Sequence, residues 1–342
     1  MIGRFLLSGY VTCCMAASAL ATDPPVSLEL ATEQGFELGG HQQWNEFLQG
    51  VGFAGLRIRG TRLGDEPKVE NRGTEDAPRY HVVGILTGGN RLQLPGASVR
   101  LGDRKQVAQW LANLRGGGSE GVTAPRGAFG MTERQLRALN DALKSPVAFD
   151  TRDQRIGDVV EKLRGALAVP VEVEAGAASA LAGNEKVLDE LSGLGSGTSL
   201  AAAVRPLGLV VVPAASGPSS VRVRITPSTG KEEVWPIGFK PQAAPNDVAP
   251  GLFRFANSVT IGERPLSEAI AAVQGRVQLP ILFDHNALAK HGIDLNQPVS
   301  LSLKKTFYSK ILTELLFPQM LRHDLKVDEA GRPFLWITTV KQ

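Results

Sequence analysis

The chain has 342 residues and a formal net charge of +3, and 43% of its residues are hydrophobic and 21% charged. These fractions are typical of globular proteins, and the length is sufficient for two or three domains. The small net charge, with no run of Lys or Arg longer than two residues, excludes nucleic acid as an expected partner.

Residues 1–21 are typical of a secretory signal peptide. Arg4 precedes an apolar stretch, and Ala19-Leu20-Ala21 provides a cleavage site. We therefore expect export, to the periplasm or to the exterior of the cell. The apolar stretch is too short to span a bilayer and no later one is longer, so we expect no stable transmembrane segment after cleavage. Cys13 and Cys14 are the only cysteines, so the mature chain would fold without disulfides.

Residues 22–118 are expected to form an N-terminal α+β domain. Apolar alternation predicts strands and a 3.6-residue period predicts helices, in the order β-α-β-β-β-α. A polar stretch over 60–79 is expected to be a loop. The glycines 116–118 end the domain, and residues 119–130 are a predicted linker. The predicted strands are 26–30, 56–59, 80–86 and 91–101, and the predicted helices are 41–51 and 103–114.

Residues 131–226 are expected to form a second α+β unit, called here the first module. Thr132 and Gln135 have the spacing of a capping box, which predicts a helix over 133–144. A Gly-, Ala- and Ser-rich stretch over 175–197 is expected to be a loose insert. The other predicted elements are strands 147–149, 171–174, 209–212 and 221–225 and helices 155–168 and 200–207.

A proline-rich stretch over 227–250 leads to the second module, residues 251–342. Its prolines fall at irregular intervals without apolar periodicity, which predicts an extended, semi-stiff connector. A hairpin turning at 328–332 is expected to close the chain. The other predicted elements are strands 255–261, 281–283 and 299–303 and helices 265–277 and 308–315.

One apolar pattern occurs in both modules, 110 residues apart, and predicts an amphipathic helix leading into a strand. Pro170 and Pro280 each open the strand. Later helices are also predicted to correspond, with Leu200 opposite Tyr308. The repeated apolar residues are Ile156, Val159, Val160, Leu163 and Leu167 in the first copy and Leu266, Ala269, Ile270, Val273 and Val277 in the second.

The run from Val259 to Ile270, then Leu279–Leu282, then Val299–Leu303 and a second helix resembles the STN domain. This small module stands at the N-termini of outer-membrane secretins and TonB-dependent signalling receptors. Residues 149–212 are similar to a more diverged copy. The chain also resembles exported bacterial proteins that end in a Phe-Leu-Trp-Ile-Thr run. The STN resemblance implies docking to other envelope proteins and supplies no catalytic residue.

We expect no secretin ring or receptor barrel after the second module, because no series of about ten-residue lipid-facing strands follows it in this sequence. Only the binding role therefore transfers from the resemblance. The expected fold class is α+β and multidomain: two tandem STN-like βαβ-type modules preceded by the N-terminal α+β domain.

Motifs for a metal or a nucleotide are incomplete. Asp284, His285, His291 and Asp294 are close in sequence, but the spacing of the histidines does not bring them together on a helix, and local turn bonds are the simpler interpretation. The loop 193–199 resembles a phosphate-binding loop but lacks its lysine, so we interpret it as a flexible link in which Thr198 or Ser199 caps the next helix. We predict no metal and no cofactor.

No catalytic residue is predicted either, although distant Ser–His pairs remain possible. Two arginine pairs, Arg57 with Arg59 and Arg222 with Arg224, are candidates for an interaction face, against an ordinary solvated strand face. Unpaired sheet edges are a second candidate. The favoured hypothesis is a non-enzymatic, exported interaction protein that binds envelope proteins. The alternatives are a secreted hydrolase acting on an extracellular polymer or peptide and a self-assembling structural component of the envelope.

Overall fold

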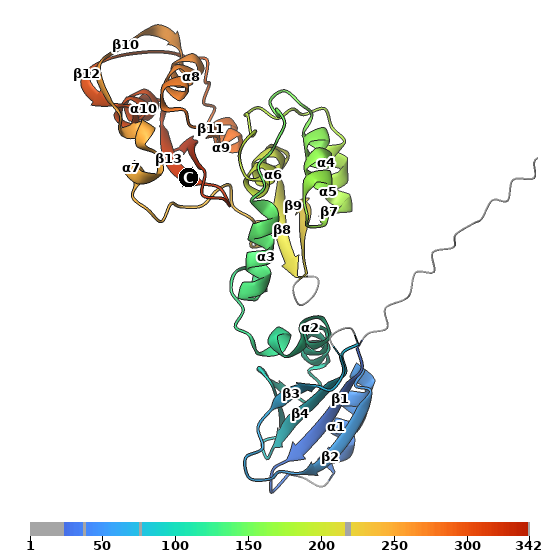
Figure 1. Ribbon diagram of the computed structural model, residues 1–342. Helices are drawn as coiled ribbons and strands as arrows, with labels where there is room; N and C mark the ends of the chain where they lie inside the picture. The colour runs from blue at the N-terminus through green and yellow to red at the C-terminus, as the bar shows by residue number, and fades with distance from the viewer. Residues whose placement is uncertain (1–23, 37–38, 75–76, 216–219, 341–342) are drawn as a thin grey trace, which may run out of the picture. The chain divides into compact units, whose positions relative to one another are not determined.

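The computed structural model describes residues 24–36, 39–74, 77–215 and 220–340, so the predicted leader lies outside the described residues. The fold is α+β, with helices packed on several small sheets (Figure 1). The chain divides into two compact units, Met1–Thr123 and Ala124–Gln342. Within the described ranges, no helix combines the length and the apolar character needed to cross a membrane.

The first unit is a six-stranded sheet with the strand order β2-β1-β4-β5-β6, and β3 pairs separately with β4. β1 runs parallel to both of its neighbours. Apolar residues on alternate positions of β1, such as Val26 and Leu28, are buried in one core with residues of both helices. The elements are β1 (Val26–Thr32), α1 (Gly40–Val51), β2 (Gly55–Gly60), β3 (Lys68–Asn71), β4 (Tyr80–Thr87), β5 (Arg91–Leu94), β6 (Ala97–Arg100) and α2 (Arg104–Thr123).

Three predictions for this unit were wrong. The loop predicted over 60–79 contains the strand β3, which has few apolar residues and is held by pairing with β4. The strand predicted over 91–101 is a hairpin, because Pro95-Gly96 turns the chain and Gly96 adopts φ 73°. The helix predicted over 103–114 continues as far as Thr123 after a break at Gly118, where φ is 57°, so the glycines 116–118 do not end the domain.

The second unit begins with the helix α3 (Glu133–Leu143), and the predicted capping box is confirmed. The Thr132 hydroxyl accepts from the Gln135 N–H, and the Gln135 side chain accepts from the Thr132 N–H. Residues 147–149, predicted as a strand, are irregular in the structure. The stretch 175–197, predicted as a loose insert, contains the helix α5. The remaining elements of the first module are α4 (Ile156–Ala166), β7 (Val171–Val173), α5 (Ala175–Leu181), α6 (Ser196–Val204), η2 (Arg205–Leu207), β8 (Leu209–Ala215) and β9 (Val221–Pro227).

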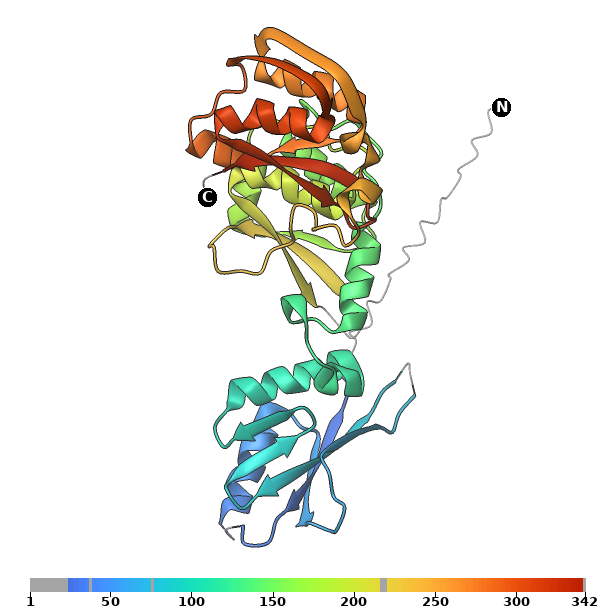
Figure 2. The same ribbon diagram turned by 90° about the vertical axis from the view of Figure 1, so that its left-hand side faces the viewer.

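The second module places two helices between two layers of strands. α8 and α10 lie between a β10–β12 ribbon and a three-stranded sheet (Figures 1 and 2). The predicted closing hairpin is confirmed as β13–β14. The elements are β10 (Phe255–Pro265), α8 (Leu266–Val277), β11 (Ile281–Phe283), α9 (His285–Lys290), β12 (Pro298–Phe307), α10 (Tyr308–Leu316), η4 (Phe317–Gln319), β13 (Leu321–Val327) and β14 (Pro333–Thr339).

The three-stranded sheets of the two modules have the same topology. Their strand orders are β7-β9-β8 and β11-β14-β13. In each, the first strand runs parallel to the central one and the third strand antiparallel. The order of helices and strands along the two modules also matches. In the described part of the first module, two isolated bridges, Pro146 with Gly195 and Arg155 with Lys186, stand where the second module has the β10–β12 ribbon.

The correspondence predicted for the later helices was wrong by about one turn. Arg205-Pro206 in η2 and Phe317-Pro318 in η4 occupy the same place, between a helix and an edge strand. This equivalence sets Leu200 of α6 opposite Leu312 of α10, not opposite Tyr308. Leu200 and Leu312 are both fully buried, whereas Tyr308 is only partly buried, so the structural alignment also matches the cores.

The connector between the modules is packed against them, contrary to the extended segment predicted over 227–250. Trp235 is buried, and its main-chain N–H donates a hydrogen bond to the carbonyl of Val211 on β8. Phe239 pairs with Val327 at the end of β13. The segment then forms α7 (Pro245–Val248) and η3 (Pro250–Phe253), whose Leu252 is buried in the second core.

Each module has its own apolar core, and the cores meet at one place. Leu282, Phe334 and Trp336 of the second module belong to the core cluster of the first, together with Trp235 from the connector. The other buried apolar residues of the second module form a separate cluster. Residues 124–342 therefore consist of two modules that are joined through a packed contact.

Candidate binding groove

Two buried carboxylates join the β13–β14 turn to the first turn of α6. Asp328 accepts a 2.6 Å hydrogen bond from the N–H of Gly195. Glu329 accepts from the Thr198 hydroxyl at 2.9 Å and from the Trp235 indole N–H at 2.7 Å. A helix N-terminus presents unpaired N–H groups and the positive end of the helix dipole. At α6, carboxylates from the second module take the place of a side-chain cap.

The glycine-rich loop 193–199 owes its composition to this contact. A Cβ on Gly197 would lie 2.6 Å from Glu329 Oε1 and 2.7 Å from the Trp235 indole nitrogen. The predicted capping by Thr198 or Ser199 was wrong, because α6 starts earlier, at Ser196, and Gly195 occupies the cap position. The place where a nucleotide phosphate would sit is taken by the chain's own carboxylates.

Burial and the neighbouring Asp328 charge raise the pKa of Glu329, although the hydrogen bonds from Trp235 and Thr198 oppose this effect. Its second oxygen, Oε2, is buried and has no hydrogen-bond partner among the residues that the structure describes. Asp328 differs, since its carboxylate is fully buried and accepts bonds from Ala330, Arg332 and Gly195 N–H groups. Asp328 therefore has the better-satisfied charge of the two.

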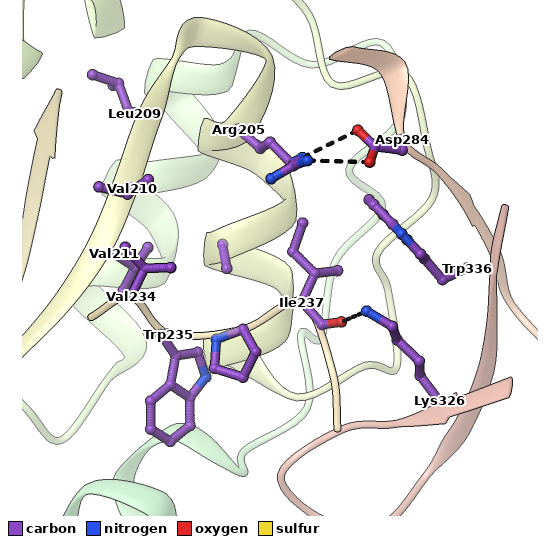
Figure 3. Close-up of a pocket in the computed structure, with 12 residues that line it drawn as sticks. Arg205, Leu209, Val210, Val211, Val234, Trp235, Ile237, Asp284, Lys326 and Trp336 are labelled. Atoms are coloured by element: carbon purple, nitrogen blue, oxygen red, sulfur yellow. Dashed lines mark hydrogen bonds and ion pairs between the residues drawn. The ribbon is translucent and has the colours of Figure 1, made fainter. Parts of the chain in front are cut away.

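A second polar contact links η2 to the start of α9. The guanidinium of Arg205 donates two hydrogen bonds to Asp284, at 3.2 and 3.1 Å (Figure 3). Asp284 also caps α9 by accepting from the Ala287 N–H at 3.2 Å, and Asn286 donates to the Arg205 carbonyl at 2.9 Å. The local-turn interpretation of Asp284 is thus confirmed, whereas Asn286 makes a contact between the modules.

His285 is also part of the contact between the modules. Its Nε2 lies 3.0 Å from an Asp189 carboxylate oxygen, which also accepts from the Phe283 N–H at 2.9 Å. His291 is exposed. Among the described residues, no group of three or more His, Cys, Asp or Glu side chains is arranged to hold a metal ion.

Beside these contacts lies a groove formed by both modules and the connector. Two hollows of about 190 and 460 Å³ share Arg205, Asp284, Lys326 and Trp336, and we call them together the inter-module groove. Figure 3 shows the smaller hollow between the β8 strand and the β14 strand. The smaller hollow is lined further by Ala201, Leu209, Val210, Val211, Val234, Trp235, Pro236 and Ile237, and the larger by Asn286, Ala287, Lys290, His291, Arg322, Asp324, Thr338 and Thr339.

Lys326 stands at the junction of the two hollows. Its ammonium donates a 2.8 Å hydrogen bond to the Ile237 carbonyl and lies 5.2 Å from the centroid of the Trp336 ring (Figure 3). Burial lowers the pKa of this lysine, and nearby Asp324 opposes that effect. The connector and the cation–π contact therefore hold a partly desolvated cation in the groove.

The four arginines proposed as an interaction face lie in two separate units. In the first, Arg57 and Arg59 stand on one face of β2, but Arg59 is ion-paired with Glu29 and Asp65, while Arg57 is exposed. In the second, both arginines of β9 form ion pairs with glutamates, one in β7 and one directly after it. These pairs are Arg222 with Glu172 at 3.1 Å and Arg224 with Glu174 at 2.9 Å. The groove cations were not predicted, because they come from three separate elements, η2, α9 and β13, that only the fold brings together.

The first unit brings Ser27, His81 and Glu29 together on neighbouring strands. Ser27 Oγ lies 3.1 Å from His81 Nδ1, and His81 Nε2 lies 3.8 Å from a Glu29 oxygen. Burial and Arg72 lower the pKa of His81, which suits a base. Ser27 is nevertheless the second residue of β1 and is paired in register with both β2 and β4, so the main chain around it is committed to the sheet, whereas an acyl-transfer site needs free N–H donors beside the nucleophile.

Comparison with known proteins assigns no family. No family model, no curated protein and no solved structure matches this chain. Function therefore has to be inferred from the groove and its charges.

Proposed function

We propose that this chain is a non-enzymatic, exported interaction protein of the cell envelope, and that another envelope protein docks in the inter-module groove. We further propose that the two modules are STN-like copies of one fold. The matching strand order and directions of their three-stranded sheets support this second part. The sequence resemblance supports it independently.

The observation that carries the proposal is a pair of groove lysines without an acidic partner. Arg205 is paired with Asp284, and Arg322 lies 3.7 Å from Asp324. Within the described part of the chain, Lys290 and Lys326 have no carboxylate oxygen within 4.0 Å. Two modules thus meet to form a recess whose charge is incompletely balanced, as expected of a docking site.

Photo-crosslinking in intact cells tests this proposal. A photoreactive amino acid at Ala287, which lines the groove, should yield a reproducible crosslink to one envelope protein. The same amino acid at Glu161, which is exposed on α4 of the first module, is the matched control and should not give that product. Identical products from both positions, or none from Ala287, would contradict docking in the groove.

A further inference from the structure

The walls of the larger hollow carry an excess of positive charge. Four basic side chains line it, Arg205, Lys290, Arg322 and Lys326, together with two acidic ones, Asp284 and Asp324. Since both carboxylates are already beside arginines, the excess is concentrated on the two lysines.

The ammonium of Lys326 has hydrogen-bonding capacity that the described chain does not use. A lysine has three N–H donors, and the structure gives this one a single acceptor, the Ile237 carbonyl. A partly desolvated cation with unused donors favours an anion beside it. An arriving carboxylate would also reverse the effect of burial, which lowers the pKa of Lys326.

The two lysines come from different elements that line the groove. Lys290 belongs to α9, which follows β11, whereas Lys326 belongs to β13. β11 and β13 flank the central strand β14, so their main chains are about 10 Å apart at the usual strand spacing. Two carboxylates on one segment can therefore each meet one of the two lysines. In an extended segment, residues i and i+2 face the same side about 7 Å apart.

We propose that the groove binds an extended, acidic protein segment with carboxylates at alternate positions, one meeting Lys326 and the other meeting Lys290. The inference rests on the proposed function and names the chemistry of the docking partner. Trp336 and Thr338 form the floor over which the segment lies. The apolar smaller hollow, which includes Val211 and Ile237, accepts an apolar side chain next to the acidic residues.

Fluorescence anisotropy on the full mature chain tests this inference with a labelled octapeptide of alternating Asp and Ser. We expect saturable binding, and a loss of about tenfold in affinity for Lys326→Gln and for Lys290→Gln, because each removes one charge-assisted contact. Lys304→Gln on β12 removes the same charge from an exposed strand outside the groove and should leave the affinity unchanged. Added salt should weaken binding.

Several outcomes would overturn the inference. These are equal affinity for a peptide of alternating Lys and Ser, unchanged affinity in both groove variants, and complete displacement by succinate at the same carboxylate concentration, which would indicate a small-molecule site. If Lys326→Gln fails to fold by circular dichroism, Lys290→Gln, which changes an exposed residue, decides the question. A groove crosslink from Ala287 without acidic-peptide binding would refute this inference and leave the proposed function standing.

Discussion

Gly197→Ala should lower the free energy of unfolding of the second unit by about 3 kcal/mol. It adds a methyl group where the packed contact between the modules has no space, and overpacking of this kind is strongly destabilising. The new methyl group would lie 2.6 Å from Glu329 Oε1, 2.7 Å from the Trp235 indole nitrogen and 3.0 Å from Leu143 Cβ. Neither the buried carboxylate nor the indole can move away without breaking the hydrogen bond between them. Urea unfolding followed by tryptophan fluorescence measures the loss.

Gly275→Ala is the matched control for this change. Gly275 is in the interior of α8, and a Cβ there would meet no atom within 4 Å. Alanine is the better helix former by about 0.8–1.0 kcal/mol, so this variant should be more stable than the natural chain. If both glycine variants change stability equally, the contact between α6 and the β13–β14 turn does not have the role assigned to it.

Asp328→Ala is expected to have the other large effect, also a loss of about 3 kcal/mol. Three main-chain N–H groups, those of Gly195, Ala330 and Arg332, donate to this fully buried carboxylate. Alanine would leave them without this acceptor, and the buried one among them, the Gly195 N–H, would alone cost about 1–3 kcal/mol. The loss should appear in urea unfolding and as faster proteolysis of the connector over 228–250.

Asp324→Ala provides the comparison for Asp328 on the same hairpin. Asp324 is 41% exposed and lies 3.7 Å from Arg322, a geometry in which a surface ion pair contributes little. Its loss should therefore change stability by less than about 0.5 kcal/mol. A similar destabilisation by both substitutions would show that negative charge on the hairpin, not the buried bonds of Asp328, stabilises the fold.

Elements with strong apolar periodicity could be predicted from the sequence. The helices α4 and α8 and the strands that follow them were all predicted, because their buried residues recur at helical spacing. The strand β3 could not, since Val69 is its only apolar residue and its pairing with β4 is a tertiary contact. The packing of the connector was equally hidden, because it depends on Trp235 and Phe239 meeting surfaces from both modules.

The candidate site was even less accessible to sequence reasoning. Asp284 and His285 were recognised as unusual, but their partners, Arg205 and Asp189, are distant in sequence. The acids at the β13–β14 turn were predicted only as part of a turn. The glycine-rich loop 193–199, which lacks the phosphate-binding lysine, did indicate that some group of the chain comes close to its main chain, because glycines permit such an approach. What approaches is Glu329, and only the fold brings it there.

The two modules pack against each other through a shared apolar contact, and the groove lies between them. Electron-spin distance measurement tests this packing most directly, with nitroxides at Glu161 on α4 and Ala272 on α8 and with Cys13 and Cys14, the only native cysteines, replaced if retained. Both labelled positions are exposed. We predict a single narrow distance distribution that broadens in the Gly197→Ala variant. A broad distribution in the otherwise unsubstituted chain would show modules that move independently and would contradict the account.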